Sequence, residues 1–193
     1  MNTKKIIIAC LCLIMIVSAT SFVYAATYEL FPGGFASAKN LTWNTSNGQY
    51  SSEASTAIAQ WSRIDSNVSF VKSSELLDHE LTISPGVINS TTANNLGMTT
   101  FYRNGTQISP TMIVNANVVW DKAVCVRYNS DLLDTFEKKT ATTTHEIGHA
   151  LSLAHCADQN ACIAKGEYHI MHQTIKTSYV PTAYDIAILK YKW

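Results

Sequence analysis

Four residues constrain this chain more than any others: His145, Glu146, His149 and His155. In an α-helix, residues four positions apart lie about 40° apart around the axis and about 6 Å apart along it. The imidazoles of His145 and His149 would therefore point at one place on a helix face, where they could hold a tetrahedral Zn²⁺. Glu146 would lie beside that face, within reach of metal-bound water. The spacing predicts a helix that carries a zinc site.

His155 can join this site only if the helix ends between His149 and His155. Six further helical residues would rotate it by roughly 240° around the axis, away from the metal. We therefore expect the helix to stop near Ser152 and the chain to turn back.

A later methionine, Met171, extends the pattern. The long histidine motif followed by a methionine resembles the metzincin zinc metallopeptidases, most closely the matrixin (matrix-metalloprotease-type) branch. The resemblance implies that His145, His149 and His155 bind one catalytic Zn²⁺, with Glu146 as the catalytic general base. It also implies that Met171 lies in a turn beneath the metal and supports the site.

Ser152 departs from the family, which usually has glycine at this position. Glycine takes a positive φ freely, whereas the same φ costs serine roughly 1 kcal/mol. We therefore expect a strained serine, or a slightly different turn, before His155.

Two other interpretations of the motif stay open. The helix could be an ordinary charged surface helix, because the short motif fixes only three residues. A rival class of zinc site takes a glutamate as its third ligand, and Glu167 is the only acid at a plausible distance. The remaining histidines are expected to be ordinary loop residues (His79, His169, His172). Two of them flank Met171 and could lie near a substrate pocket.

Helices are predicted at three places. Apolar residues recur at helical spacing after a start signal at Ser51, so a first helix should end near residue 62. Asp134 and Glu137 form a capping pair that should open the helix carrying the zinc motif. Pro181 fits the first turn of a last helix. In that helix, Asp185 resembles the family's aspartate that accepts hydrogen bonds from the backbone beneath the methionine turn.

Strands are predicted at 41–43, 68–70 and 81–83, and at 112–120 as the centre of the sheet. The last of these depends on alternating apolar residues, which are Met112, Val114, Ala116, Val118 and Trp120. The expected fold class is α+β, a metzincin-like zinc peptidase domain. The resemblance implies a twisted, mostly parallel sheet with an antiparallel edge strand, packed on two long helices, plus a C-terminal helix.

Residues 84–110 have a loop-like composition, interrupted by one short apolar segment. In the family, an edge strand at this place pairs with the backbone of the substrate. The resemblance implies this role for Leu96, Gly97, Met98, Thr99 and Thr100, and the alternative is an ordinary edge strand. Residues 81–120 contain no Asp or Glu. Many matrixins hold structural calcium and a second zinc in this region, so neither is expected here.

The first 25 residues are predicted to be a signal peptide, followed by one catalytic domain over residues 26–193. Lys4 and Lys5 precede an apolar run, and small residues allow cleavage after Ala25. The protein is therefore expected to be secreted and extracellular, with no membrane partner after the signal is removed. A zinc-blocking propeptide has no room before residue 31, so activity without proteolytic activation is expected.

Three cysteines follow the predicted cleavage site. In an oxidising environment a bridge is expected, and Cys156 with Cys162 is favoured because they bracket a short segment after His155. Pairing of Cys125 with one of them, or three free thiols, stays open.

The charge of residues 26–193 is nearly balanced, with 12 basic and 14 acidic residues. This balance does not favour nucleic acid or an anionic membrane as a partner. The expected partner is a peptide or protein substrate, and the chain is expected to be a monomer.

The predicted function is that of a secreted zinc-dependent endopeptidase that cleaves peptide bonds with metal-bound water, activated by Glu146 as general base. One alternative is a secreted zinc-binding recognition module that does not hydrolyse, although binding alone needs no general base. Another is a zinc amidase that acts on non-protein substrates.

Overall fold

The computed structural model describes residues 29–46, 50–74, 79–87, 95–155, 163–164 and 167–193. Six strands form the main sheet: β1 (Leu41–Thr45), β2 (Phe70–Lys72), β3 (Leu81–Val87), β4 (Gly97–Arg103), β5 (Thr106–Gln107) and β6 (Lys122–Asn129). A separate two-stranded sheet consists of β7 (Ile163–Ala164) and β8 (Glu167–Tyr168). The helices are α2 (Ser51–Ser62), α3 (Pro110–Asn115), α4 (Phe136–Ala150) and α5 (Ala183–Lys192).

The main sheet has the strand order β2-β1-β3-β6-β4-β5. The first four of these strands are mutually parallel, whereas β4 runs antiparallel to β6 and forms a hairpin with β5. The structure thus confirms a mixed α/β fold with a mostly parallel sheet. The hairpin pairs only Tyr102 and Arg103 of β4 with β5, so the first half of β4 keeps an edge without a strand partner among the described residues.

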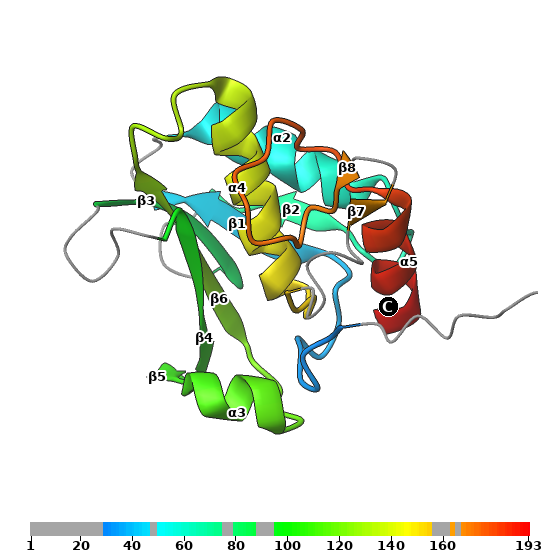
Figure 1. Cartoon of the computed structure of the whole chain (residues 1–193). Helices are drawn as coiled ribbons and strands as arrows, with labels where there is room; N and C mark the ends of the chain where they lie inside the picture. The colour runs from blue at the N-terminus through cyan, green and yellow to red at the C-terminus, as the bar shows by residue number, and fades with distance from the viewer. Residues whose placement is uncertain (1–28, 47–49, 75–78, 88–94, 156–162, 165–166) are drawn as a thin grey trace, which may run out of the picture.

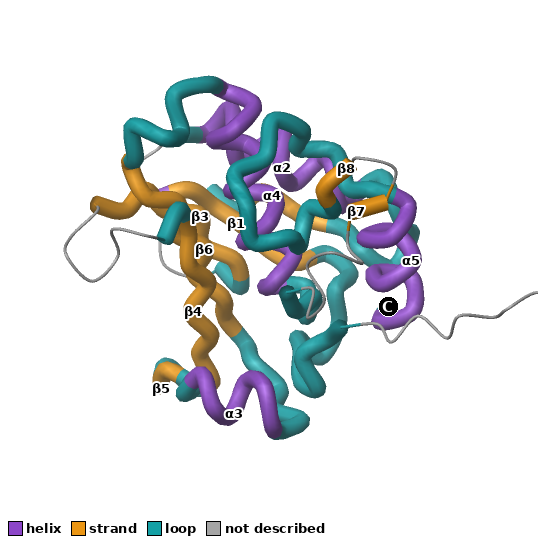
Figure 2. The backbone as a smooth tube through the Cα atoms, in the orientation of Figure 1, coloured by secondary structure: helices purple, strands orange, loops and turns teal. Residues whose placement is uncertain are grey.

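Helix α4 packs against α2 and against β4 and β6, and it crosses one face of the sheet with α2 beside it (Figure 1). The apolar residues that predict α2 are buried, namely Ala54, Ala57, Ile58 and Trp61. The indole Nε1 of Trp61 donates to the carbonyl oxygen of Thr144 at 2.9 Å, which ties α2 to the middle of α4. The loop before α5 runs back along α4 (Figure 2).

The prediction of a central strand over residues 112–120 is wrong. Residues Pro110–Asn115 form α3 instead, because Pro110 stands in its first turn and the side chain of Ser109 caps it by accepting from Met112 N. Met112 and Val114 are exposed, and Ile113 between them is buried. The central position belongs to β6, whose alternate residues are buried.

Two predicted caps are also corrected. Helix α4 begins after Thr135, whose side chain accepts from Lys138 N, while Asp134 lies outside the helix and pairs with the Lys138 ammonium at 2.8 Å. Helix α5 begins after Thr182, so Pro181 precedes the cap instead of standing in the first turn.

Several predictions fall outside the described residues, including the signal peptide over residues 1–25 and the Cys156–Cys162 bridge. Cys125 is a buried free thiol in β6. None of the described helices has both the length and the apolar composition needed to span a membrane.

Candidate metal centre

Helix α4 ends one residue after His149, at Ala150, and the way it ends positions His155. Leu151 is its C-cap, and Ser152 follows with a φ of 75°. The amide of Ser152 donates to the carbonyl of His149 at 2.9 Å, and the amide of Leu153 donates to that of Gly148 at 3.0 Å. These two bonds define a Schellman motif, which turns the chain back sharply. The predicted helix stop is therefore present, with serine in the strained left-handed position.

The chain after this turn is held by the N-terminal segment. Phe31 N donates to the carbonyl of Ser152 at 2.8 Å, and Ala154 N donates to that of Glu29 at 2.9 Å. The ring of Phe31 also lies 5.7 Å from that of His149, centroid to centroid. Residues far apart in sequence thus fix the direction in which the chain leaves α4 towards His155.

The side chain of Ser152 needs space that Gly34 leaves open. A Cβ on Gly34 would lie 2.7 Å from the Ser152 hydroxyl oxygen, too close for a real contact. That hydroxyl is fully buried and has no hydrogen-bond partner among the described residues. Serine is therefore accommodated here by a glycine opposite, although its hydroxyl is left unsatisfied.

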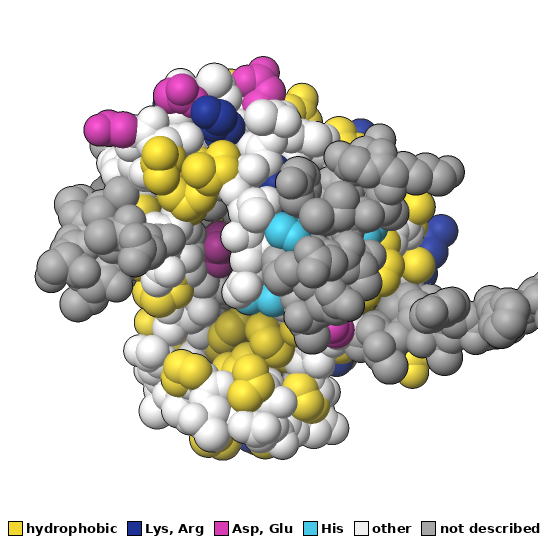
Figure 3. Space-filling model, in the orientation of Figure 1, with side chains coloured by type: hydrophobic (Ala, Val, Ile, Leu, Met, Phe, Trp, Pro, Cys, Tyr) yellow, Lys and Arg dark blue, Asp and Glu magenta, His cyan; other side chains and the backbone are white. Residues whose placement is uncertain are grey.

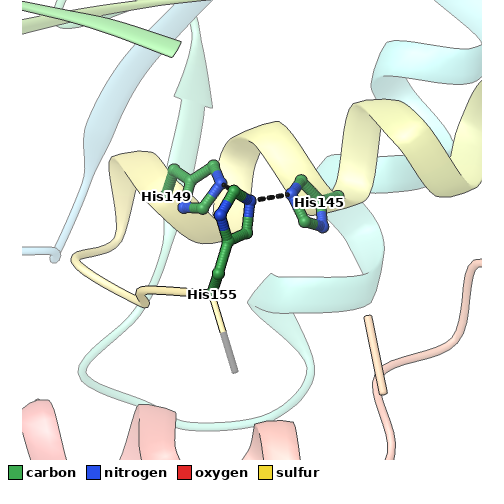
Figure 4. Close-up of side chains that lie close together, drawn as sticks. All are labelled: His145, His149 and His155. Carbon is green, nitrogen blue, oxygen red and sulfur yellow. Dashed lines mark hydrogen bonds between the residues drawn. The ribbon is translucent and has the colours of Figure 1, made fainter. Parts of the chain in front are cut away.

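The three histidines converge on one point. His145 and His149 lie one turn apart on α4, and His155 reaches back from the following segment (Figure 4). The Nε2 atom of His155 lies 3.0 Å from Nε2 of both His145 and His149. Ligands at Zn–N distances of 2.0–2.1 Å in a tetrahedron would lie about 3.3 Å apart. Within the described residues these three form the one group that could hold a metal ion.

Hydrogen bonds to the opposite ring nitrogens favour this arrangement. Nδ1 of His145 lies 2.6 Å from the carbonyl oxygen of Ile170, and Nδ1 of His149 lies 2.8 Å from that of Leu153. A carbonyl only accepts, so each Nδ1 carries the proton and each Nε2 keeps a lone pair for a metal. Nδ1 of His155 lies 2.7 Å from the side-chain amide of Gln173. The Gln173 atom at this distance is the amide nitrogen, and the nitrogen and oxygen of an amide are assigned from the hydrogen-bond network. With the two exchanged, the oxygen accepts from Nδ1, and the Nε2 of His155 also keeps its lone pair for a metal.

Burial keeps all three imidazoles neutral. Desolvation is the main cause that lowers the pKa of His149 from 6.5 to about 3 and that of His155 to about 4, and it lowers the pKa of His145 well below its ordinary value. Neutral imidazole is the form that binds metal. The donor set, its spacing and its protonation therefore all fit Zn²⁺.

Met171 lies buried beneath the helix that carries the ligands. A Cβ on Gly148 would overlap the sulfur of Met171, so glycine at this position allows the methionine to approach α4. The buried carboxylate of Asp185 accepts from Ile170 N at 3.0 Å and from Met171 N at 3.4 Å. Because the carbonyl of Ile170 holds His145, Asp185 connects α5 to a candidate metal ligand through one peptide unit.

Glu146 lies against the first half of β4. The hydroxyl of Thr99 donates to its carboxylate oxygen Oε2 at 2.7 Å. A Cβ on Gly97 would overlap its other oxygen, so glycine there is needed for the close approach of strand and carboxylate. Burial raises the pKa of Glu146 from 4.5 to about 7, and the Thr99 hydrogen bond opposes that rise.

The thiol of Cys125 lies behind Glu146, 3.3 Å from its carbonyl oxygen. Burial raises the pKa of this thiol far above its ordinary value, with the charge of Glu146 adding to the effect. A thiol in this state is inert, as expected for a packed side chain.

A cavity of about 790 Å³ opens over the histidines and Glu146. Four of the five predicted edge-strand residues line it, namely Leu96, Gly97, Met98 and Thr99, whereas Thr100 does not. Figure 3 shows histidine side chains near the centre of this face, with apolar side chains below them and to their upper left.

The opposite wall comes from the segment after Met171. His172, Gln173, Thr174 and Lys176 all line the cavity, whereas His79 and His169 do not. The sequence assigned no role to Gln173 or Lys176, and for Thr99 it indicated a place in the edge strand but not the hydrogen bond to Glu146. No motif in the sequence distinguishes Lys176 within this wall.

Comparison with protein-family models and with curated protein sequences gives no match. The solved structures that are partly similar to this chain include three with low sequence identity. Myroilysin aligns with a TM-score of 0.49 and 13% identity over 82% of this chain and 94% of that one. Archaemetzincin from Methanopyrus kandleri aligns with a TM-score of 0.44 and 14% identity, over 81% of this chain and 96% of that one. A chain of the GM1-bound ECX AB5 holotoxin aligns with a TM-score of 0.45 and 14% identity, over 86% of each chain. The functional assignment depends on the site itself.

Proposed function

We propose that this protein is a zinc-dependent endopeptidase of the metzincin type, with matrixin-like features. The observation that carries the proposal is the convergence of three neutral imidazoles beside a buried carboxylate in one open cavity. His145, His149 and His155 would hold the ion. When bound, Zn²⁺ would supply Lewis acidity towards the scissile carbonyl and lower the pKa of the attacking water.

The other steps belong to the chain's own residues. Glu146 would take the proton from the attacking water and deliver it to the departing amine. Thr99 keeps the Glu146 carboxylate against β4, at the edge of the cavity. The free edge of β4 would align a peptide by main-chain hydrogen bonds, since its first half has no strand partner in the described part of the chain. Secretion after removal of residues 1–25, a monomeric state and a Cys156–Cys162 bridge remain predictions of the same proposal.

The test is a pair of substitutions in the zinc-loaded protein. Glu146→Gln should keep about one zinc per chain while kcat for a peptide falls by at least about 100-fold, the usual scale for loss of a general base. His155→Ala should instead lower zinc affinity. Zinc content by elemental analysis and peptide cleavage with and without a chelator provide the measurements.

The outcomes separate the candidate functions. A zinc-loaded protein that cleaves no peptide would be a recognition module or an amidase, and assays on non-protein amides would distinguish these. If His155→Ala left zinc affinity unchanged while Glu167→Gln removed the metal, the ligand set would be wrong.

A further inference from the structure

Lys176 is a buried cation in the wall of the cavity that the proposed mechanism does not use. Only 8% of its surface is exposed. Its ammonium donates to the main-chain oxygen of His172 and, at 3.0 Å, to that of Thr174. An ammonium has three donors, so these two neutral acceptors leave one donor for a further partner.

This charge has no carboxylate partner within the part of the chain that the structure describes, where the one ion pair is Lys138 with Asp134. The two interior carboxylates that attract Lys176 both accept hydrogen bonds from other groups. Asp185 accepts from the backbone of the methionine turn and from Thr182, and Glu146 accepts from Thr99. Burial is the main influence on Lys176 and lowers its pKa to about 8, whereas attraction to these two carboxylates opposes the shift. Lys176 therefore remains mostly charged at neutral pH.

Glu146 is the one carboxylate among the described residues that line the cavity, and it already accepts from Thr99. Thr142 and Thr174 supply neutral hydroxyls, and the three histidines of the candidate metal centre are neutral. An apolar side chain entering beside Lys176 would remove water from the ammonium without supplying a hydrogen-bond acceptor. A basic side chain would be repelled by its charge. A carboxylate would gain a charge-assisted hydrogen bond in a poorly solvated place.

We propose that Lys176 is a specificity-determining residue that selects substrates with Asp or Glu next to the cleaved bond. The inference rests on the proposed peptidase function and names its substrate class: peptides with an acidic residue at one of the two positions flanking the cut. The carboxylate would accept a hydrogen bond from the third N–H of the ammonium, which the two main-chain carbonyls leave unused.

Cleavage of matched peptides is the first measurement. Glu, Gln and Leu are placed in turn at each flanking position, and kcat/KM is measured for the zinc-loaded wild type. Glu should exceed Gln by about 10-fold or more at one position, the scale of a hydrogen bond to a charged group. Lys176→Met should reduce that ratio to near 1, whereas Lys190→Met, an exposed lysine on α5, should preserve it. Equal ratios in the wild type and Lys176→Met would overturn the proposal.

Binding without turnover is the second measurement, and it separates the two proposals. Calorimetry on zinc-loaded Glu146→Gln should show tighter binding of the Glu peptide than of the Gln peptide, and adding Lys176→Met should remove the difference. If binding depends on Lys176 but the wild type cleaves no peptide, the proposed peptidase function is wrong and the proposed role of Lys176 is retained. If the wild type cleaves peptides with no preference for Glu, the peptidase function is retained and the proposed role of Lys176 is wrong.

Two further controls address misfolding of the variant and recognition of a terminal carboxylate. If Lys176→Met does not fold, Lys176→Gln replaces it and should likewise reduce the Glu-to-Gln ratio of kcat/KM. Peptides that end after the flanking residue are compared as free acids and as amides. A preference that follows the terminal carboxylate instead of the side chain would overturn the assignment to Asp or Glu.

Discussion

Glu146 shows how single contacts set the chemistry of this site. Its carboxyl group is buried, which raises its pKa to about 7, and the hydroxyl of Thr99 limits that rise by donating to the ionised form. A general base works only when it is deprotonated. The pH at which activity begins should therefore depend on Thr99, the threonine of β4 that donates to this carboxylate.

Thr99→Val should move the acid limb of kcat/KM to higher pH, because loss of the hydrogen bond removes an influence that lowers the pKa of Glu146. Zinc content should not change. Thr100→Val is the matched control, since Thr100 is the neighbouring residue of β4 and does not line the cavity. An acid limb that stays in place in Thr99→Val would show that the hydroxyl does not tune the base.

Ser152 is a second residue with a measurable cost. Its φ of 75° and its buried unsatisfied hydroxyl both disfavour serine. Ser152→Gly should raise the free energy of unfolding by about 1 kcal/mol, the scale of the left-handed strain. Ser152→Ala removes the hydroxyl and retains the strain, so it should stabilise less. Urea denaturation of the metal-free variants measures both, and an equal gain in the two would show that the hydroxyl alone carries the cost.

At the scale of elements, the site depends on how closely α4 approaches its neighbours. Gly97 of β4 gives space to the carboxylate of Glu146, and Gly148 of α4 gives space to Met171. Each glycine is needed for a close approach and not for a special backbone conformation, because neither has a positive φ. Small changes at these contacts should move catalytic groups without unfolding the domain.

Gly97→Ala should lower kcat by about 10-fold or more with zinc binding retained, since the new Cβ would displace the Glu146 carboxylate from its place beside Thr99. Gly105→Asn is a suitable control, because Gly105 lies in an open hairpin turn at a positive φ that asparagine tolerates. Unchanged kcat in Gly97→Ala would mean that the carboxylate has more freedom than the structure implies.

Elements also show where sequence reasoning succeeds and fails. The histidine spacing predicts α4 and its early stop because helix geometry alone relates His145, His149 and His155. The alternation over residues 112–120 predicts a strand wrongly, because a local signal, Ser109 with Pro110, starts a helix there. Lys176 could not be assigned from sequence, since its burial depends on how the segment after Met171 folds back over the cavity. The spacing of residues in the sequence predicts local geometry, whereas it does not predict contacts between distant segments.

At the scale of the whole molecule, three distant segments meet at the metal centre. Residues 29–31 hold the turn after α4, the methionine turn holds His145 through Ile170, and α5 holds that turn through Asp185. Metal binding should therefore report on the folding of the entire domain. A bound ion stabilises the folded state by mass action, so zinc should raise the thermal midpoint.

The pH dependence of the metal-free chain tests this coupling. The three ligand histidines have folded pKa values below 6.5, so the unfolded chain binds more protons than the folded one as the pH falls through 6.5. Their contribution to stability is present above pH 6.5 and is lost below it. Glu146 acts oppositely between 4.5 and 7, because its folded pKa is raised, but it is one group against three.

Urea denaturation of the metal-free protein at pH 7.5, 6.5 and 5.5 should therefore show a falling free energy of unfolding, with most of the loss below pH 6.5. His149→Leu removes one of the titrating groups and keeps an uncharged side chain of similar size, so its loss across the same interval should be smaller. Zinc competes with protons for the same nitrogens, so the metal-loaded chain should retain its stability to lower pH. A free energy that is flat from pH 7.5 to 5.5, or a His149→Leu slope equal to that of the wild type, would mean that these imidazoles are not held neutral by the fold.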